Sequence, residues 1–168
     1  MWTSASGEEQ VLTKIVSDYN QIENPGKFVV RKQTDGSYTI IGISVEDING
    51  EAIRVHPILD TPISVSSATR SAGATINLIL EALTAQGGTK VSFGIGPLNL
   101  LVRSQVTVGG TNVSARGLLL QTIAGIEPAK LVWELLYDTD GKTYYFSLIP
   151  KQRAHYDAFG GRTTEMIP

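Results

Sequence analysis

Apolar residues recur at helical spacing near the start of the chain. A helix would place them on a single stripe, which consists of Val11, Leu12, Ile15, Val16 and Tyr19. Ser6 and Glu9 have the spacing of a capping box at the beginning of this segment. Asn24-Pro25-Gly26 is typical of a helix end. The pattern therefore predicts one amphipathic helix between these two signals.

Two further helices are predicted in the second half of the chain. The first has apolar residues at positions i, i+3, i+4 and i+7, which are Ile76, Ile79, Leu80 and Leu83. Gly87-Gly88 supplies the stop at its C-terminal end. Ser114 can cap the second helix, and Gly125 closes it. Its apolar positions are Ala115, Leu118, Leu119 and Ile123.

Two Asp-Gly turns each lie between β-rich runs. The first hairpin predicted in this way covers residues 28–43 around Thr34-Asp35-Gly36, and the second covers residues 131–148 around Thr139-Asp140-Gly141. Shorter runs predict additional strands at residues 52–56, 91–95 and 105–108, the last of them ahead of Gly109-Gly110. Residues 57–73 are rich in Pro and Ser and predict a connector with a short strand near Ile63–Val65.

These elements indicate an α+β fold, with helices packed on one face of small mixed or antiparallel sheets. We expect a helix-plus-hairpin unit over residues 1–60, an αβ module of βαβ type over 61–150 and a flexible tail over 151–168, where no periodicity is seen. One continuous domain is the alternative. The two helix–hairpin units share a pattern, which either duplication or independent use of Asp-Gly turns would explain.

Composition excludes several classes of protein. The 168 residues include no Cys and two His, so disulfide frameworks, zinc fingers, iron–sulfur clusters and thiol nucleophiles are not expected, and neither is a metal or cofactor. Arg103, Arg116 and Lys130 are too scattered for a nucleic-acid groove, and the net charge is −2. The chain has no apolar run near the roughly 18 residues that a membrane span needs.

Four stretches of the second half carry a family resemblance. They are Leu80-Glu81-Ala82-Leu83-Thr84-Ala85-Gln86-Gly87-Gly88, then Lys90-Val91-Ser92-Phe93, then Gln105-Val106-Thr107-Val108 followed by Val113-Ser114-Ala115-Arg116-Gly117-Leu118-Leu119, and finally the hairpin from Leu131-Val132-Trp133-Glu134 to Tyr144-Tyr145-Phe146-Ser147-Leu148. Together they resemble the secretin/TonB short N-terminal (STN) domain over about residues 62–149. Gly94-Ile95-Gly96-Pro97-Leu98-Asn99-Leu100-Leu101 is longer than the usual link, and residues 1–60 fall outside the pattern.

The STN resemblance implies a non-enzymatic interaction or assembly module in the periplasm or another extracytoplasmic compartment of a double-membraned bacterium. It implies no catalytic residue. Residues 1–7 lack the basic start and the apolar stretch of about 7–15 residues typical of an export signal. A chain trimmed of that signal would look the same as a cytosolic one, so we expect the signal, if the protein is exported, to lie outside this sequence.

Candidate chemical sites are weak by comparison. Gly94-Ile95-Gly96-Pro97 lacks the third glycine of a dinucleotide fingerprint and the Gly-Lys-Ser/Thr of a phosphate loop. Glu46, Asp47 and Glu51 do not have the ligand order of a calcium loop. No nucleophile motif accompanies the candidate triad residues, which are His56, His155, Asp60 and Asp157. A small ligand-binding or hydrolytic site near the 94–104 loop is the alternative function.

Aromatic residues gather on the second predicted hairpin. Strand alternation places Tyr144 and Phe146 on one face and Tyr145 on the other. We expect Tyr145, with Val132 and Leu136, to form an exposed contact surface, and Arg103 is a further candidate contact residue. The alternative is that helices cover both faces. An unpaired strand edge would let a protein partner bind by strand addition, whereas a pocket uniting His56, Asp60 and a serine would favour the hydrolase.

Overall fold

The computed structural model describes residues 5–24, 26–33, 36–47, 49–127, 130–156 and 161–166. Contacts divide the chain into two compact units, residues 1–57 and 58–168. The fold is α+β, with helices and several small antiparallel or mixed sheets.

The first unit contains helix α1 (Ala5–Gln21) and a three-stranded antiparallel sheet. Its strands are β1 (Gly26–Lys32), β2 (Tyr38–Glu46) and β3 (Ala52–Arg54), in the order β1-β2-β3. The hairpin predicted around Thr34-Asp35-Gly36 is confirmed for its strands, while Thr34 and Asp35 themselves lie outside the described residues.

Helix α1 packs on this sheet through a narrower stripe than the sequence predicts. Val16 is buried, and the partly exposed Tyr19 contacts the Phe28 ring of β1 edge-on, with centroids 5.6 Å apart, but Val11 and Ile15 remain exposed. Part of the contact between α1 and the sheet is polar. Asn20 Nδ2 donates to Phe28 O over 2.7 Å, and Phe28 N donates to Asn20 Oδ1 over 2.9 Å. Because Asn20 faces the sheet, the helix is rotated so that part of the predicted apolar stripe is left outside the contact.

The second unit holds the other helices and two main sheets. Its elements are η1 (Ile58–Asp60), β4 (Pro62–Ser71), α2 (Ala72–Gly87), β5 (Lys90–Phe93), α3 (Leu98–Arg103), β6 (Gln105–Ser114), α4 (Ala115–Ala124), β7 (Leu131–Asp138) and β8 (Thr143–Pro150). Strands β4 and β6 pair antiparallel. The other sheet has the order β5-β8-β7, with β5 parallel and β7 antiparallel to β8.

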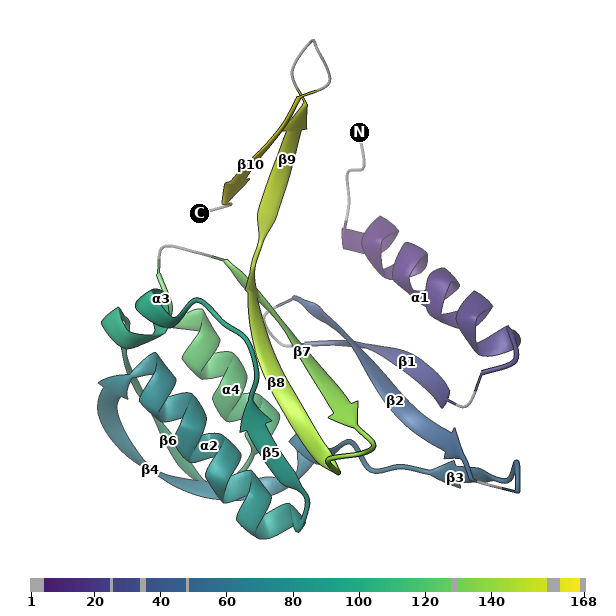
Figure 1. The fold of residues 1–168 in the computed structure, drawn as a ribbon, viewed down its shortest axis with the longest axis horizontal. Coiled ribbons are helices and arrows are strands. Elements are labelled where there is room, and N and C mark those ends of the chain that lie inside the picture. Colours follow the sequence, from purple (N-terminus) through teal and green to yellow (C-terminus); the bar gives the residue numbers. More distant parts are fainter. Residues whose placement is uncertain are drawn as a thin grey trace. The chain divides into compact units, whose positions relative to one another are not determined.

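Helices α2 and α4 lie between these two sheets (Figure 1). Ile76, Ile79 and Leu83 of α2 are fully buried, as is Leu118 of α4. The inward residues of both sheets close the same core, and they are Ile63, Val65, Val91, Val106, Val108, Phe146 and Leu148. Each sheet therefore has one face on the helices and one face directed away from them.

The helix-end signals predicted at Ser114 and Gly88 are confirmed, and Ser71 is an N-cap that the sequence pattern did not predict. Ser71 Oγ accepts from Ala74 N at the start of α2, and Ser114 Oγ accepts from Gly117 N at the start of α4, each over 3.2 Å. Gly88 ends α2 with φ of +69°, a left-handed conformation that glycine adopts without strain. The predicted C-terminal stop therefore lies where the sequence indicated.

Two segments differ from the sequence prediction. The connector expected over residues 57–73 is mostly strand β4, because its Ser and Thr residues face outward while Ile63 and Val65 fill the core. The loop expected over 94–104 contains α3, whose Leu101 is buried in the same core. In both cases tertiary burial of a few apolar residues stabilises an element that local composition did not signal.

Strand β6 also continues through Gly109-Gly110, where the sequence indicated an end. A β-bulge places Ser66 and Ser67 of β4 opposite Gly109, and a Cβ at Gly109 would overlap their backbone atoms. The glycine thus permits close approach of two strands rather than a turn.

The region predicted as a flexible tail contains two strands. β9 (Gln152–Tyr156) and β10 (Arg162–Met166) pair antiparallel with each other. No periodicity in the sequence signals them.

Candidate interaction surface

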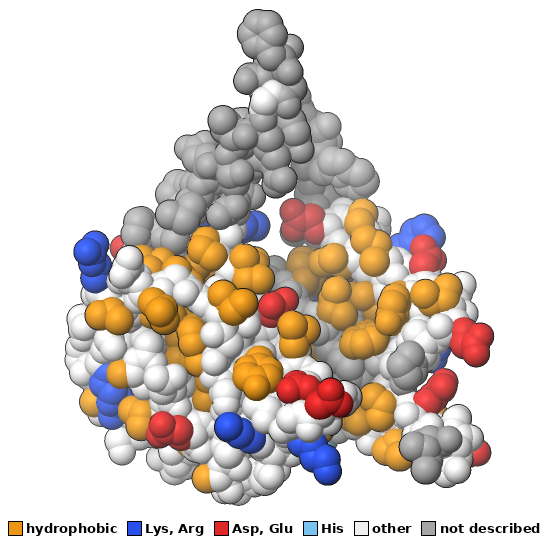
Figure 2. Space-filling view, in the orientation of Figure 1, with side chains coloured by type: hydrophobic (Ala, Val, Ile, Leu, Met, Phe, Trp, Pro, Cys, Tyr) orange, Lys and Arg blue, Asp and Glu red, His pale blue; other side chains and the backbone are white. Residues whose placement is uncertain are grey.

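The outer face of the three-stranded sheet carries an apolar surface. Val132 pairs with Ile149 and Leu136 pairs with Tyr145 across β7 and β8, so all four side chains lie on the same face. Their exposed fractions are 45% for Val132, 43% for Ile149, 57% for Leu136 and 40% for Tyr145. Hydrophobic side chains gather over β7 and β8 in Figure 2. We call these four residues the outer apolar face.

The outer face of the other sheet is polar. Its exposed residues include Ser64, Thr69, Gln105 and Thr107, and the hydroxyls of Thr69 and Thr107 are 2.8 Å apart in a hydrogen bond. A one-sided sheet normally alternates apolar residues toward the core with polar residues toward water. The β4–β6 sheet follows this rule, whereas the β7–β8 pair departs from it.

The opposite face of β7 and β8 carries two pairs of aromatic rings. The Trp133 and Phe146 rings stack with centroids 5.9 Å apart, and Arg116 Cζ lies 5.5 Å from the Trp133 ring centroid. The Tyr137 and Tyr144 centroids are 4.6 Å apart, and burial, together with Tyr137, raises the pKa of the Tyr144 phenol above its usual value of 10.0. These rings lie on the side of β7 and β8 opposite to the outer apolar face.

Strand β7 is an edge of its sheet, and the register shows which of its backbone groups face outward. Lys151 N donates to Lys130 O over 2.8 Å, so this pair is a hydrogen-bonded one. Hydrogen-bonded and non-hydrogen-bonded pairs alternate in antiparallel strands, so the next pair, Leu131 with Pro150, is not hydrogen-bonded. This agrees with the chemistry of Pro150, which has no N–H to donate. The backbone groups that point away from β8 are consequently those of Leu131, Trp133, Leu135 and Tyr137.

None of the backbone hydrogen bonds found among the described residues reaches these outward groups of β7. The strand is eight residues long and pairs with β8 without a register shift. Strands β4 and β6, by contrast, contain register shifts. β7 therefore offers a regular edge next to an apolar face, a combination that suits the addition of another strand.

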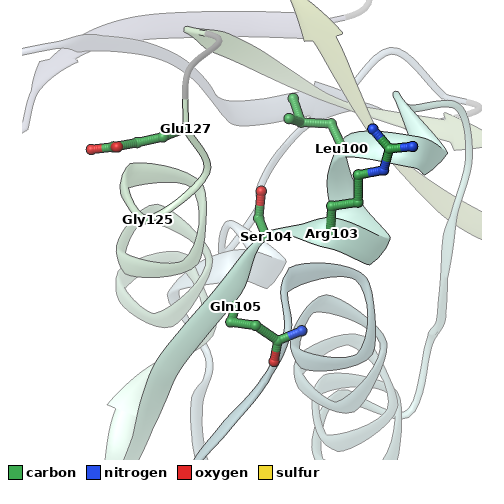
Figure 3. A pocket seen from close by; sticks show the side chains of 6 residues that line it. All are labelled: Leu100, Arg103, Ser104, Gln105, Gly125 and Glu127. Carbon is green, nitrogen blue, oxygen red and sulfur yellow. The ribbon is translucent and has the colours of Figure 1, made fainter.

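The fourth predicted contact residue, Arg103, lies elsewhere in the second unit. It ends α3 and lines an open pocket of about 400 Å³ with Leu100, Ser104, Gln105, Gly125 and Glu127. In Figure 3 the side chains of Arg103 and Glu127 point away from each other. Their charges do not converge on a common point, as they would in a specific small-ligand site.

The residues proposed for hydrolysis are divided between the two units of the chain. His56 is exposed and belongs to the first unit, while Asp60 belongs to the second and accepts a hydrogen bond of 2.7 Å from Arg116 Nε. His155 lies in β9, and Asp157 lies outside the described residues. Neither of the two pockets described, near Arg103 and near Arg70, includes His56 or Asp60.

The acidic residues near Asn49-Gly50 form a hydrogen-bonded turn. Asp47 Oδ1 accepts from Asn49 N over 2.8 Å and from Glu51 N over 2.9 Å. These two bonds, that from Glu51 first, lower the pKa of the Asp47 carboxyl below its usual 3.8. Within the described part of the chain no three His, Cys, Asp or Glu residues group as metal ligands do.

The sequence pattern identified Tyr145, Val132 and Leu136 as contact residues, but Ile149 and Glu134 of the same face were not identified. Ile149 follows Tyr145 at an even spacing of four residues, and this alternation could have identified it. Glu134 lies between Val132 and Leu136 on β7, opposite Ser147. Its position could have been read from the same alternation, whereas the open edge could not, because strand order is decided by non-local pairing.

The comparisons with known proteins give no family assignment. No protein-family model matches the chain, and neither a curated protein nor a solved structure is significantly similar to it. None of the helices in the described residues has the length and apolar character needed to span a membrane.

Proposed function

We propose that residues 58–168 form a non-enzymatic protein-interaction module that binds an extended segment of a protein partner. The observation that carries this proposal is the outer apolar face of β7 and β8 beside the open edge of β7. Main-chain hydrogen bonds at the edge would supply affinity, and side chains of the added strand that alternate onto the outer apolar face would supply selectivity.

The element order is compatible with the STN resemblance and supports its use as a guide. Each of the four resembling stretches falls on an element of matching type: the end of α2, strand β5, strand β6 with the Ser114-capped α4, and the β7–β8 hairpin. On this basis we also propose that the protein acts in the periplasm or another extracytoplasmic compartment, as an assembly or signalling contact.

The test uses the full chain and three synthetic peptides with the pattern Thr-Val-Thr-X-Thr-Val-Thr, where X is Lys, Gln or Glu. Amide hydrogen exchange is followed by NMR with and without each peptide. We expect binding to slow exchange at Leu131, Trp133, Leu135 and Tyr137, because their N–H groups would enter new hydrogen bonds. If none of the peptides protects these amides, the proposed strand addition is wrong.

A ligand-binding or hydrolytic function near residues 94–104 is the second candidate, and the pocket beside Arg103 is the observation that favours it. A panel of generic esters and phosphate esters tests it. Turnover that is lost in an Arg103→Ala variant and kept in an Arg31→Ala variant would support this function over the interaction module.

A further inference from the structure

We infer that the strand added to β7 carries a basic side chain opposite Glu134, between two apolar side chains that lie opposite Val132 and Leu136. This inference rests on the proposed function and specifies the chemistry of the partner. It is carried by the place of one carboxylate within the outer apolar face.

Glu134 is the only charged residue that points from the middle of β7 to the outer face, among the described residues of β7 and β8. Its neighbours on that face are Val132 and Leu136 along the strand and Ser147 across it. The side chain is half-buried, and no ion pair involving it is found in the described part of the chain. Water is therefore its principal partner while the β7 edge is open.

Adding a strand to β7 would remove part of that water. Residues directly opposite each other in antiparallel strands have Cβ atoms about 4.5–5.5 Å apart on the same face. A carboxylate that loses water without gaining a partner is destabilised, whereas a Lys or Arg directly opposite would restore its interactions. Glu134 thus rejects strands that are apolar throughout and favours a basic residue at one position.

The residues two places to either side of that basic residue would lie opposite Val132 and Leu136. Apolar side chains there would extend the outer apolar face and shield it from water. The partner segment therefore alternates apolar, basic and apolar residues on one side. A positive charge opposite Glu134 also fixes the register, since a shift by two residues would place it opposite an apolar side chain.

A second copy of this chain fits the edge poorly. Among the two-fold pairings of β7 with β7 that keep the outer faces on the same side, the two with the longest overlap are centred on Glu134 and on Leu135. The first register places two Glu134 carboxylates opposite each other, and the second places Glu134 diagonal to Glu134 and Asp138 of the other copy. Like charges so placed destabilise strand pairing, although the first register would also bring Lys130 near Asp138 at its exposed ends.

The test measures the affinity of the three fluorescent peptides for the full chain by anisotropy. We expect the Lys peptide to bind roughly threefold more tightly than the Gln peptide and about tenfold more tightly than the Glu peptide. Glu134→Lys should reverse this order, and Glu134→Gln, which keeps the side-chain shape, should abolish it. Glu81→Lys is the matched control, because it makes the same charge change at an exposed position of α2 and should leave the order unchanged.

The outcomes separate the two levels of the proposal. Equal affinities for the three peptides in the wild type, with β7 amides protected by each, would overturn the inference about Glu134 and leave strand addition standing. Absence of binding by all three would overturn both. A third outcome is that the wild type without peptide sediments as a dimer and its β7 amides are protected in the same sample. That result would identify a second copy as the occupant and also overturn the inference.

Discussion

Arg116 Nε donates to Asp60 Oδ1 over 2.7 Å, and the side chains of the two residues are only 8% and 21% exposed. Asp60 belongs to η1, at the start of the second unit, and Arg116 belongs to the first turn of α4. The guanidinium also lies over the Trp133 ring of β7. One ion pair therefore links the first residues of this unit to a central helix and to the strand that carries the proposed edge.

Removal of either partner should destabilise the second unit. Asp60→Asn leaves the buried guanidinium without its counter-charge, and Arg116 Nη1 already has no hydrogen-bond partner. Breaking a buried pair costs about 3–5 kcal/mol, and the partial exposure of Asp60 places the expected loss at the lower end. Urea unfolding followed by circular dichroism measures it.

The Lys14–Asp18 pair of α1 is the matched control for this experiment. Its N–O distance of 2.8 Å is similar, but the side chains are 75% and 58% exposed. Asp18→Asn should lower the free energy of unfolding by no more than about 0.5 kcal/mol. Equal losses of unfolding free energy in the two variants would show that the Asp60–Arg116 pair stabilises the protein no more than an exposed ion pair does.

Polar substitutions on the outer apolar face should separate binding from stability. Leu136→Thr combined with Tyr145→Thr places β-branched threonine, which favours strands, at both positions and removes apolar surface that faces water. We expect the melting temperature to change little and affinity for the Lys peptide to fall about tenfold.

A buried residue of β8, the strand that contains Tyr145, serves as the contrast. Leu148 is 1% exposed, so Leu148→Ala should cost about 2–5 kcal/mol of stability. If the surface pair destabilised the chain as much as Leu148→Ala does, the outer apolar face would be a structural surface and not a binding one.

The turn at Asp47 should make the first unit sensitive to acid. The backbone hydrogen bonds from Glu51 and Asn49 hold the pKa of the folded Asp47 carboxyl below that of the unfolded chain. The resulting stabilisation is present above the unfolded value of 3.8 and is lost as the pH falls through the lower folded value. NMR titration of the Asp47 carboxyl should give a midpoint below 3.8.

Asp47→Asn provides the thermodynamic counterpart of that titration. The difference in unfolding free energy between wild type and variant should be present at neutral pH and shrink below about pH 4, as the wild-type carboxyl becomes protonated. A difference that stays constant over this range would mean that ionised Asp47 does not stabilise the turn.

Gly109 should tolerate no side chain. A Cβ there would overlap backbone atoms of Ser66 and Ser67, which cannot move without disturbing the bulge in β4. Gly109→Ala should destabilise the second unit by about 1–3 kcal/mol or more. Gly73→Ala in α2 is the control, because its Cβ would make an ordinary contact of 3.5 Å with Leu101 Cβ.

Gly73→Ala is expected to be neutral or slightly stabilising, since alanine favours the helix by up to about 1 kcal/mol. Thermal unfolding of both variants measures the contrast. Similar effects of the two substitutions would indicate that β4 moves away from Gly109 without loss of stability.

The amino-acid sequence alone determined the elements whose signals are local. Ser114 and Gly88 mark helix ends because capping depends on the residues within one turn. The alternation from Leu131 to Tyr137 and that from Tyr144 to Phe146 each divided a strand into two faces, and this identified Val132, Leu136 and Tyr145 as candidate contact residues.

Only the tertiary structure decided which strand forms an edge, which face the helices cover and where Arg103 lies. These features depend on pairing and burial between residues far apart in the chain, such as Arg116 with Asp60 and Gly109 with Ser67. The same physical reason explains why the full length of β4 and helix α3 were not predicted. Their stability comes from a few side chains that are buried in a shared core, and the residues next to them in the sequence do not indicate that burial.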